Sequence, residues 1–430
     1  MQDKLIIHGL ERFNILEGEI YIQGAKNASL KTMASSILFD GEIEIQNVPK
    51  TTDILNLEKL LLGLGAKTRW EQNTIFIDTS NIDKDKVLDK ELATNMRASV
   101  VLTGPLLARF KRVVFPSPGG CVIGARPIDL FLNSFEKMGA TVEYDGQNFI
   151  IESRDGLTGT QIFFPLQSVG ATETIMMSAV LAKGQTVLKN CALEPEIVSL
   201  GEFLISNGAN IKGLGTTTIV IEGGALLKAK NPSKTIPDRI EAGSYMILGA
   251  LCGKTVEIKG INSDHLDSLT QVLLKSGAQL SFRSNGELSD CIVSASKDIQ
   301  PFDIRTHEYP GFPTDLQAPI VTYLSLANGD SRVFETIYES RFKYVNDLIS
   351  MGAKIDILNP REINVHGVKQ FVAPENPIEV KDIRAGFAVI LGALCAKGDT
   401  EISNIKLVDR GYEDIVGKLS KIGAKIQRLG

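Results

Sequence analysis

The sequence has no excess of positive charge, and this limits the partners it can bind. Its 430 residues carry 46 Lys and Arg against 51 Asp and Glu, a formal net charge of −5. Non-specific nucleic-acid binding requires a basic surface, so we expect no nucleic-acid partner. The share of hydrophobic residues (43%) and of charged residues (23%) is typical of a folded globular protein and excludes a disordered chain.

Long apolar runs, paired cysteines and metal-binding motifs are also missing. The apolar run 385–396 is shorter than the roughly 18 residues of a membrane span, and the first residues have no signal-peptide core. Five cysteines without paired spacing favour a reducing compartment. We therefore expect a cytoplasmic protein without a membrane contact. The four histidines do not have the spacing of metal ligands, and no metal is expected: they are His8, His265, His307 and His366.

Glycine is abundant and marks an internal repeat. The chain has 39 Gly, above the usual share of about 7%. A Gly-Ala pair recurs six times at near-equal intervals of roughly 70 residues. Each pair follows an amphipathic stretch such as 55–62 and precedes a strand, so the Gly is expected in the left-handed position that ends a helix. The six positions are Gly65, Gly139, Gly208, Gly277, Gly352 and Gly423.

A second element recurs with the same period. Helices rich in small residues are predicted to begin near Ala28, Ala98, Ala171, Ala242, Ala318 and Ala385. They are apolar nearly all round, which predicts that they are buried. Each unit is expected to hold a buried helix, a strand, an amphipathic helix and further strands. Six such units predict an α/β protein with two domains of three repeats.

Cations stand at the starts of four of these buried helices, where the helix dipole disfavours them. This placement favours an anion held between the helices. The alternative is that local ion pairs, Asp238 with Arg239 and Asp382 with Arg384, cap their helices. The four cations are Lys26, Arg97, Arg239 and Arg384.

One cysteine differs from the others. Cys121 lies in the Gly- and Pro-rich segment 116–127, close to Arg126. A nearby guanidinium lowers a thiol pKa, and such a thiol can act as a proton donor and as a nucleophile. The other four are expected to be small core residues: Cys191, Cys252, Cys291 and Cys395.

Several motifs occur in one order along the chain: Lys26-Asn27, Arg97, the segment PGGCVIGARP at 118–127, Asp315, Arg341, Asp382-Ile383-Arg384-Ala385 and DRGYE at 409–413. With these motifs the chain resembles the UDP-N-acetylglucosamine 1-carboxyvinyltransferase family of enolpyruvyl transferases over essentially its full length. The resemblance implies two inside-out α/β barrel domains, each of three βα repeats. One domain would hold residues 1–25 and 236–430. The other would hold 26–235 with the cysteine loop, and the active site would lie in the cleft between them.

The resemblance also implies the reaction. The enolpyruvyl group of phosphoenolpyruvate would pass to the 3-hydroxyl of UDP-N-acetylglucosamine with release of phosphate, the first committed step of peptidoglycan precursor synthesis. No metal, cofactor or obligatory protein partner is implied. Asp315 would be the base that takes the hydroxyl proton, although its alternative role is a helix N-cap. Cys121 would protonate the enolpyruvyl methylene and would be the target of fosfomycin.

The remaining roles come from the same resemblance. The catalytic residues would be Lys26, Cys121, Asp315 and Arg410. Phosphoenolpyruvate would be bound by Lys26, Asn27, Arg97, Arg126, Arg384 and Arg410. The nucleotide sugar would be bound by Asn27, Arg97, Arg126, Pro127, Ile128, Asp129, Leu130, Gln167, Ser168, Val169, Asp315, Ile337 and Arg341.

Four positions depart from the family pattern. Phe131 stands where the family commonly has His, Leu166 where it has Lys, Leu193 where it has Arg before Glu-Pro-Glu, and Ser340 where it has Asn. Two alternatives stay open. The first is a related transferase that uses shikimate 3-phosphate, a family without such a cysteine loop. The second is a catalytically silent paralogue that binds a nucleotide sugar.

Overall fold

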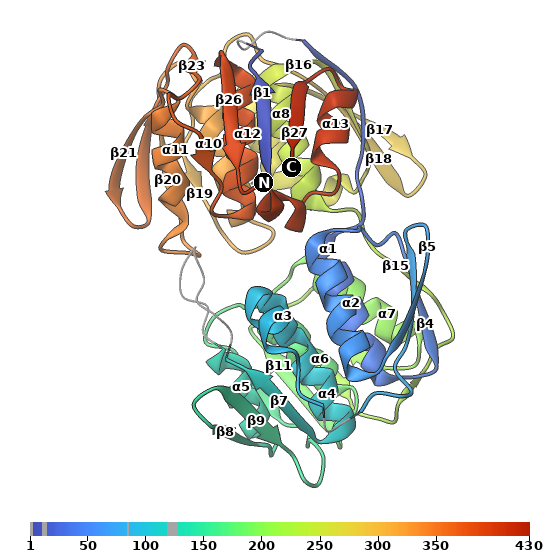
Figure 1. Cartoon of the computed structure of the whole chain (residues 1–430). Helices are drawn as coiled ribbons and strands as arrows, with labels where there is room; N and C mark the ends of the chain where they lie inside the picture. The colour runs from blue at the N-terminus through green and yellow to red at the C-terminus, as the bar shows by residue number, and fades with distance from the viewer. Residues whose placement is uncertain (1–2, 11–14, 84–85, 118–127) are drawn as a thin grey trace. The chain divides into compact units, whose positions relative to one another are not determined.

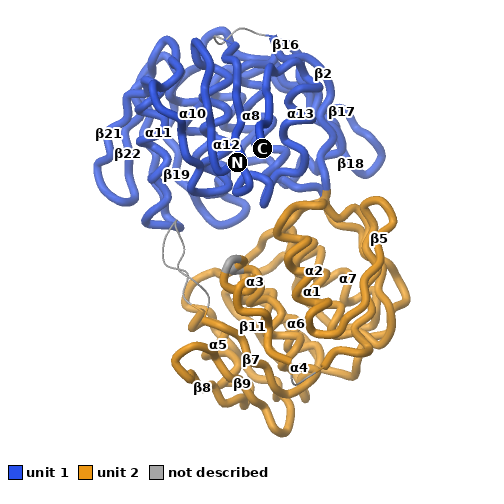
Figure 2. Tube along the Cα trace, viewed as in Figure 1, with its two compact units in different colours: residues 1–23, 121–125, 237–430 blue, residues 24–120, 126–236 orange. Residues whose placement is uncertain are grey.

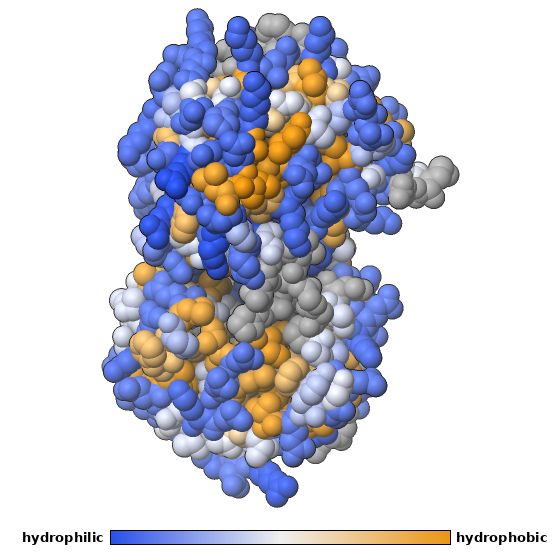
Figure 3. Space-filling view, turned by 90° about the vertical axis from the view of Figure 1, so that its left-hand side faces the viewer, coloured by the Kyte–Doolittle hydropathy of each residue, from blue (hydrophilic) through white to orange (hydrophobic). Residues whose placement is uncertain are grey.

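A computed structural model describes residues 3–10, 15–83, 86–117 and 128–430, which form two compact units (Figure 2). The N-terminal unit comprises residues 24–117 and 128–236, and the C-terminal unit comprises residues 3–23 and 237–430, each within the described ranges. Among these residues no helix has the length and apolar character that a membrane crossing requires. The surface in Figure 3 is predominantly hydrophilic, with apolar patches on both units.

The N-terminal unit consists of helices α1 to α7 and strands β3 to β15 (Figure 1). The helices are α1 (Lys26–Ser35), α2 (Thr52–Leu64), α3 (Lys90–Asn95), α4 (Thr103–Phe110), α5 (Asp129–Lys137), α6 (Val169–Ala179) and α7 (Pro195–Ser206). The strands are β3 (Phe39–Asp40), β4 (Glu42–Gln46), β5 (Lys67–Glu71), β6 (Thr74–Asp78), β7 (Arg112–Pro116), β8 (Thr141–Tyr144), β9 (Asn148–Glu152), β10 (Gln161–Phe163), β11 (Gln185–Lys189), β12 (Asn210–Lys212), β13 (Thr218–Glu222), β14 (Leu227–Lys228) and β15 (Ser233–Lys234).

The C-terminal unit takes its first two strands from the start of the chain. Its helices are α8 (Arg239–Cys252), α9 (Asp267–Lys275), α10 (Gln317–Leu324), α11 (Val345–Ser350), α12 (Ile383–Cys395) and α13 (Ile415–Lys421). Its strands are β1 (Lys4–His8), β2 (Leu16–Tyr21), β16 (Gly253–Ile261), β17 (Gln279–Asn285), β18 (Leu288–Ser294), β19 (Ile304–Arg305), β20 (Asp330–Phe334), β21 (Lys354–Asn359), β22 (Glu362–His366), β23 (Phe371–Val372), β24 (Ile378–Glu379), β25 (Ala396–Lys397), β26 (Asp399–Ser403) and β27 (Lys425–Leu429).

The larger sheets repeat one pattern, in which a central strand has a parallel neighbour on one side and an antiparallel neighbour on the other. In the N-terminal unit β4 pairs in this way with β15 and β6, and β11 pairs with β10 and β13. In the C-terminal unit β16 pairs with β2 and β18, β20 with β19 and β22, and β26 with β24 and β1. The shared pattern is the structural form of the repeat in the sequence.

The helices rich in small residues are the centre of each unit. Every residue of α12 from Arg384 to Cys395 is buried, and α8 is buried from Ile240 to Cys252. Helices α8, α10 and α12 contact one another, and so do α4 and α6. The strands of the outer sheets alternate between buried and exposed residues, as in β4 and β13. The prediction that these helices are buried is therefore confirmed.

The six Gly-Ala pairs end helices as predicted. All six glycines have a positive φ, between 89° at Gly277 and 108° at Gly208. Residues with a side chain rarely adopt this conformation, and Gly does so without steric cost. The glycines follow α2, α5, α7, α9, α11 and α13 within two residues.

Two of the predicted buried helices are divided. The segment near Ala98 begins as the 3-10 helix Arg97–Leu102 before α4, and α10 follows the short 3-10 helix Thr314–Leu316. Both α-helices have Pro as their third residue, Pro105 and Pro319. Proline has no N–H and crowds the carbonyl four residues earlier, so a continuous α-helix cannot run through it.

The chain passes from one unit to the other at residues 23–24 and 236–237. The backbone N–H of Asp238 donates to the carbonyl of Gln23 at 2.9 Å. Two residues further, the N–H of Ala25 donates to the carbonyl of Ile236 at 2.7 Å. Backbone hydrogen bonds thus join the two connecting segments, 23–25 and 236–238.

A pair of adjacent glycines after β13 provides a test of how tightly the N-terminal unit is packed. A Cβ on Gly223 would lie 1.8 Å from the carbonyl oxygen of Ala182, whereas a Cβ on Gly224 would meet nothing within 4 Å. We expect Gly223→Ala to lower the free energy of unfolding by about 1–3 kcal/mol, and Gly224→Ala to change it by less than about 0.5 kcal/mol. Urea denaturation of both variants measures this difference. Equal midpoints would show that the backbone at Ala182 gives way without cost.

Candidate active site

A single carboxylate between two buried guanidinium groups is the centre of the candidate site in the C-terminal unit. Asp315 lies in the 3-10 helix Thr314–Leu316 directly before α10. Arg341 Nη2 donates to Asp315 Oδ1 at 2.8 Å, and Arg384 Nε lies 3.6 Å from Asp315 Oδ2. The two arginines are 4% and 5% exposed, whereas the Asp315 side chain is 29% exposed. Solvent therefore reaches the carboxylate but hardly reaches its two cations.

The two guanidinium groups carry more donors than this carboxylate accepts. Within the described part of the chain, Nη1 of Arg341 and Nη1 of Arg384 have no hydrogen-bond partner. A buried donor without an acceptor is costly, and the cost is larger for a charged group. The arrangement favours an anion that accepts from the remaining N–H groups.

The local charges keep both arginines protonated. Burial alone would lower the pKa of Arg341, but the carboxylates of Asp315 and Asp382 outweigh burial and raise it. Burial also acts to lower the pKa of Arg384, and the nearby Tyr412, Asp315 and Asp238 reverse this and raise it. Both cations are permanent features of the site at any physiological pH.

Aromatic packing fixes the Arg384 side chain. Its guanidinium lies 5.0 Å from the centre of the Tyr412 ring, and Tyr412 stacks on Phe387 with 4.7 Å between ring centres. The Tyr412 hydroxyl lies 2.8 Å from Ser244 Oγ. A Cβ at Gly411 would lie 2.6 Å from Ile383 and 3.3 Å from Arg384 Nη1. The Gly and the Tyr of the DRGYE segment thus hold Arg384 in place.

The caps of α8 and α12 test the local-ion-pair alternative. Asp382 accepts from the backbone N–H of Arg384 and Ala385, and Asp238 accepts from Ile240 and Glu241. Both aspartates are therefore helix caps, as that alternative requires. The ion pair of Arg384 is formed with Asp315, whereas Asp382 accepts from the backbone of α12. Asp315 is not the N-cap of its 3-10 helix, because that position is held by Pro313. Its carboxylate faces two arginines instead.

Glu335 is a residue of this site that the sequence did not reveal. It is fully buried and accepts from the backbone N–H of Ile337 at 2.8 Å and of Tyr338 at 3.0 Å. Thr314 Oγ1 donates to its other oxygen at 2.9 Å. Glu335 thereby ties the segment with Ile337 to the residue before Asp315. Thr314 and Glu335 are 21 positions apart, and the sequence between them has no periodic pattern that would predict the contact.

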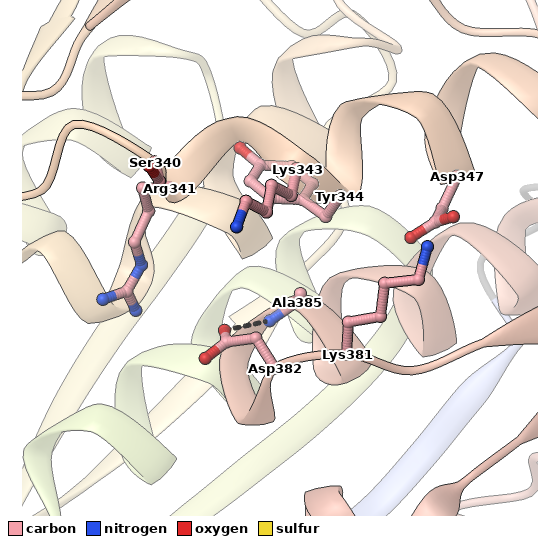
Figure 4. Close-up of a pocket in the computed structure, with 8 residues that line it drawn as sticks. All are labelled: Ser340, Arg341, Lys343, Tyr344, Asp347, Lys381, Asp382 and Ala385. Atoms are coloured by element: carbon pink, nitrogen blue, oxygen red, sulfur yellow. Dashed lines mark hydrogen bonds between the residues drawn. The ribbon is translucent and has the colours of Figure 1, made fainter. Parts of the chain in front are cut away.

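A small pocket lies beside Arg341 and receives side chains from the 3-10 helix Arg341–Tyr344, from α11 and from the start of α12 (Figure 4). The ammonium of Lys381 is turned toward the carboxylate of Asp347. Burial raises the pKa of Asp347, and the charge of Lys381 opposes this only in part. Ser340, where the family commonly has Asn, is also part of the lining.

In the N-terminal unit, Lys26 is the first residue of α1 and is 9% exposed. Its ammonium lies 3.1 Å from Asp53 Oδ2, near the start of α2. Asp53 is itself buried. The sequence did not predict this partner, because the two residues are 27 positions apart and the segment between them gives no sign of a contact. Asn27 follows in α1 and is half-buried.

The other predicted residues of this unit lie at helix starts. Asp129 is the first residue of α5, with Ile128 buried before it and Leu130 half-buried after it. Ser168 caps α6 by accepting from the N–H of Ala171 at 3.3 Å, and Val169 begins that helix. The amide of Gln167 donates to the carbonyl of Cys191 at 3.2 Å.

Cys121, Arg126 and Pro127 lie outside the described residues, as does the side chain of Arg97, whose backbone begins a 3-10 helix. Arg410 ends the 3-10 helix Ile405–Arg410 in the C-terminal unit and is half-buried. Within the described ranges, no group of three or more His, Cys, Asp or Glu is arranged to hold a metal ion.

Comparison with known proteins places this geometry in a family. The model of the family described as EPSP synthase (3-phosphoshikimate 1-carboxyvinyltransferase) matches residues 10–419. The UDP-N-acetylglucosamine 1-carboxyvinyltransferase 2 of Carboxydothermus hydrogenoformans is 42% identical over 427 residues, 99% of both chains. The chain belongs to the UDP-N-acetylglucosamine 1-carboxyvinyltransferase family. It is therefore a transferase, and the resemblance seen in the sequence is confirmed.

Further members of the UDP-N-acetylglucosamine 1-carboxyvinyltransferase family match over the full length. The protein of that name from Thermodesulfovibrio yellowstonii is 40% identical over 99% of this chain and 100% of its own. Among solved structures, the enolpyruvyl transferase NikO from Streptomyces tendae is similar with a TM-score of 0.88 at 22% identity, over 100% of this chain and 99% of that one. EPSP synthase from Acinetobacter baumannii reaches 0.75 at 18% identity, over the full length of both chains. These two likenesses concern the fold, and they confirm the predicted two-domain α/β architecture.

Proposed function

We propose that the chain transfers the enolpyruvyl group of phosphoenolpyruvate to the 3-hydroxyl of UDP-N-acetylglucosamine and releases phosphate. The relatives that share about 40% of its residues over their whole length bear this name. The structural observation that carries the proposal is the Asp315 carboxylate between two buried arginines with N–H groups to spare. This arrangement can hold an anionic substrate beside a carboxylate that accepts a proton.

The reaction proceeds by addition and elimination. The sugar oxygen forms a bond to C2 of phosphoenolpyruvate while its proton passes to Asp315, and Cys121 gives a proton to C3. The bond from C2 to the phosphate oxygen then breaks as C3 returns a proton to the Cys121 thiolate, and the proton held by Asp315 passes to the departing phosphate. Fixed cations stabilise the negative charge of the substrate and of the departing phosphate without reorganisation.

The resemblance implies anion-binding residues in both halves of the sequence. Lys26, Asn27, Arg97 and Arg126 belong to the N-terminal half, and Arg384 and Arg410 to the C-terminal half. The ammonium of Lys26 lies 3.1 Å from Asp53 Oδ2. A phosphate or carboxylate would compete with Asp53 for this cation.

In the cell this reaction would supply precursors for peptidoglycan and so serve wall growth, cell shape and division. It would take place in the cytoplasm, where phosphoenolpyruvate and the nucleotide sugar are soluble substrates. Modification of Cys121 by fosfomycin would stop it.

Phosphate release from phosphoenolpyruvate tests the proposal directly. We expect release with UDP-N-acetylglucosamine and none with shikimate 3-phosphate. The second acceptor is included because the matching family model carries the shikimate-type description. Release only with shikimate 3-phosphate would replace the proposed acceptor. Binding of the nucleotide sugar without any release would identify a silent paralogue.

A further inference from the structure

Two cysteine thiols in the core of the C-terminal unit lie next to each other. Cys252 is the last residue of α8, and Cys395 is the last residue of α12. Their Sγ atoms are 3.1 Å apart, and both residues are 0% exposed. Because the sulfur–sulfur bond of a disulfide is about 2.05 Å long, these two sulfurs need to approach by only about 1 Å to form one. The proposed reaction uses neither thiol.

The internal repeat brings the two cysteines together. Residues 247–252 and 390–395 have the same sequence, Ile-Leu-Gly-Ala-Leu-Cys, and each segment ends a buried helix. The two helices contact each other in the core of the unit (Figure 1). Equivalent positions of two repeats therefore meet at the ends of α8 and α12.

The third repeat of this unit has an ordinary apolar residue at the same position. Its segment 326–330, Leu-Ala-Asn-Gly-Asp, corresponds to 395–399, Cys-Ala-Lys-Gly-Asp. Leu326, the counterpart of Cys395, is also 0% exposed. The fold thus accepts a leucine where the other two repeats have cysteine, and packing by itself does not require a thiol there.

Backbone hydrogen bonds from the start of the chain hold both helix ends. The N–H of Leu10 donates to the carbonyl of Leu394 at 2.7 Å, and the N–H of Ile15 donates to the carbonyl of Cys252 at 3.1 Å. Two groups held at a fixed short distance react with each other much faster than with groups in solution. The setting therefore favours a bond between these two sulfurs over reaction of either with another thiol.

We propose that Cys252 and Cys395 form a site of reversible oxidation, at which a peroxide converts the two thiols into a disulfide between α8 and α12. In a reducing compartment the thiols are the resting state, and the disulfide forms only when oxidant accumulates. The oxidant reaches the buried pair when the helix ends open locally. The inference does not depend on the proposed transferase reaction.

The oxidation is balanced with one molecule of hydrogen peroxide. The thiolate of one cysteine attacks a peroxide oxygen, the O–O bond breaks, and a sulfenic acid and a hydroxide form. The sulfur of the other cysteine then attacks the sulfenic sulfur, the S–S bond forms, and the S–O bond breaks with release of a second hydroxide. The hydroxides take up the two thiol protons, so two thiols and one peroxide give one disulfide and two waters. Dithiothreitol reverses the step by thiol–disulfide exchange.

The disulfide would change the stability of the unit. Cys252 and Cys395 are 143 positions apart in the sequence, and a cross-link that closes a long loop restricts the unfolded chain more than one that closes a short loop. We expect the thermal midpoint of the C-terminal unit to rise by about 5–10 °C on oxidation and to return on reduction.

Mass spectrometry and thermal unfolding of the peroxide-treated protein test the inference. Cys121→Ser serves as the background, because it removes the thiol that is expected to react with oxidants itself. Loss of two hydrogen atoms should lower the intact mass by about 2 Da, and a non-reducing peptide map should link the peptides of Cys252 and Cys395. As a second route to the bond, the same protein is refolded from urea in a mixture of oxidised and reduced glutathione.

The matched control is Cys291→Ala, which removes another fully buried cysteine of the same unit, in β18. It should keep the mass change and the rise in thermal midpoint, whereas Cys395→Ala should lose both. If Cys395→Ala does not fold, the peptide map of the background protein still decides the question. Oxygen or glutathione attached to either cysteine without a link, or two unmodified peptides after both treatments, would overturn the proposal. None of these measurements involves phosphate release, so failure of the proposed function would leave their outcome unchanged.

Discussion

Asp315→Asn is expected to lower kcat for phosphate release by about 10²–10⁴-fold, the usual contribution of a general base. The amide has the shape of the carboxylate and can still accept from Arg341 Nη2, the donor at 2.8 Å, but it cannot take the hydroxyl proton. The KM for both substrates should change much less. Steady-state kinetics with each substrate varied in turn measures the two effects separately.

The matched control for this variant is Asp356→Asn in β21, whose side chain is 68% exposed and lies 3.0 Å from His366. It removes the same charge in the same unit and should keep full activity. A fall in thermal midpoint with an unchanged kcat in Asp315→Asn would show that Asp315 only neutralises Arg341 and Arg384. That outcome would reject its role as the base.

Replacement of Cys121 is expected to separate turnover from inhibition. Cys121→Ser should lose activity by at least about 10²-fold, since a hydroxyl is a much weaker acid than a thiol. Cys121→Asp should retain turnover because a carboxylic acid can still donate a proton, and it should resist fosfomycin because it lacks the sulfur nucleophile. Intact mass after incubation should show one adduct on the wild type and none on Cys121→Asp.

The described cysteines provide an internal control for that experiment. Burial raises the pKa of Cys191 to about 11 and that of Cys291 to about 12, so both remain protonated and unreactive at neutral pH. Cys252 and Cys395 are also fully buried. A fosfomycin adduct that persists in Cys121→Asp would place the reactive thiol elsewhere and contradict the assignment.

The repeat could be predicted from the sequence because its signals are local. A left-handed residue after an amphipathic helix requires Gly almost regardless of the surroundings, and all six glycines conform. The division of the helices near Ala98 and before α10 also has a local cause, the prolines Pro105 and Pro319. The sequence analysis missed it because the apolar pattern continues through both prolines.

The partners of the site residues could not be predicted in this way. Asp53 beside Lys26, and Glu335 beside Thr314, are contacts between segments that only the folded chain brings together. The pairing of Arg384 with Asp315 rather than with the adjacent Asp382 depends on the same tertiary geometry. Sequence motifs indicate which residues act, whereas the environment that tunes each of them arises from packing.

The strand β1 lies between β26 and β27, so that Lys4 pairs with Ser403 on one side and with Leu429 on the other (Figure 1). During synthesis the first strand leaves the ribosome long before both of its neighbours exist. The N-terminal unit is complete once residue 236 has emerged and can fold while translation continues. The C-terminal unit must wait for β26 and β27, because β1 pairs with both of them at the other end of the sequence. Loss of β27 would therefore leave one finished unit and one in which the buried strand β1 becomes the edge of its sheet, and an apolar edge strand is prone to aggregation.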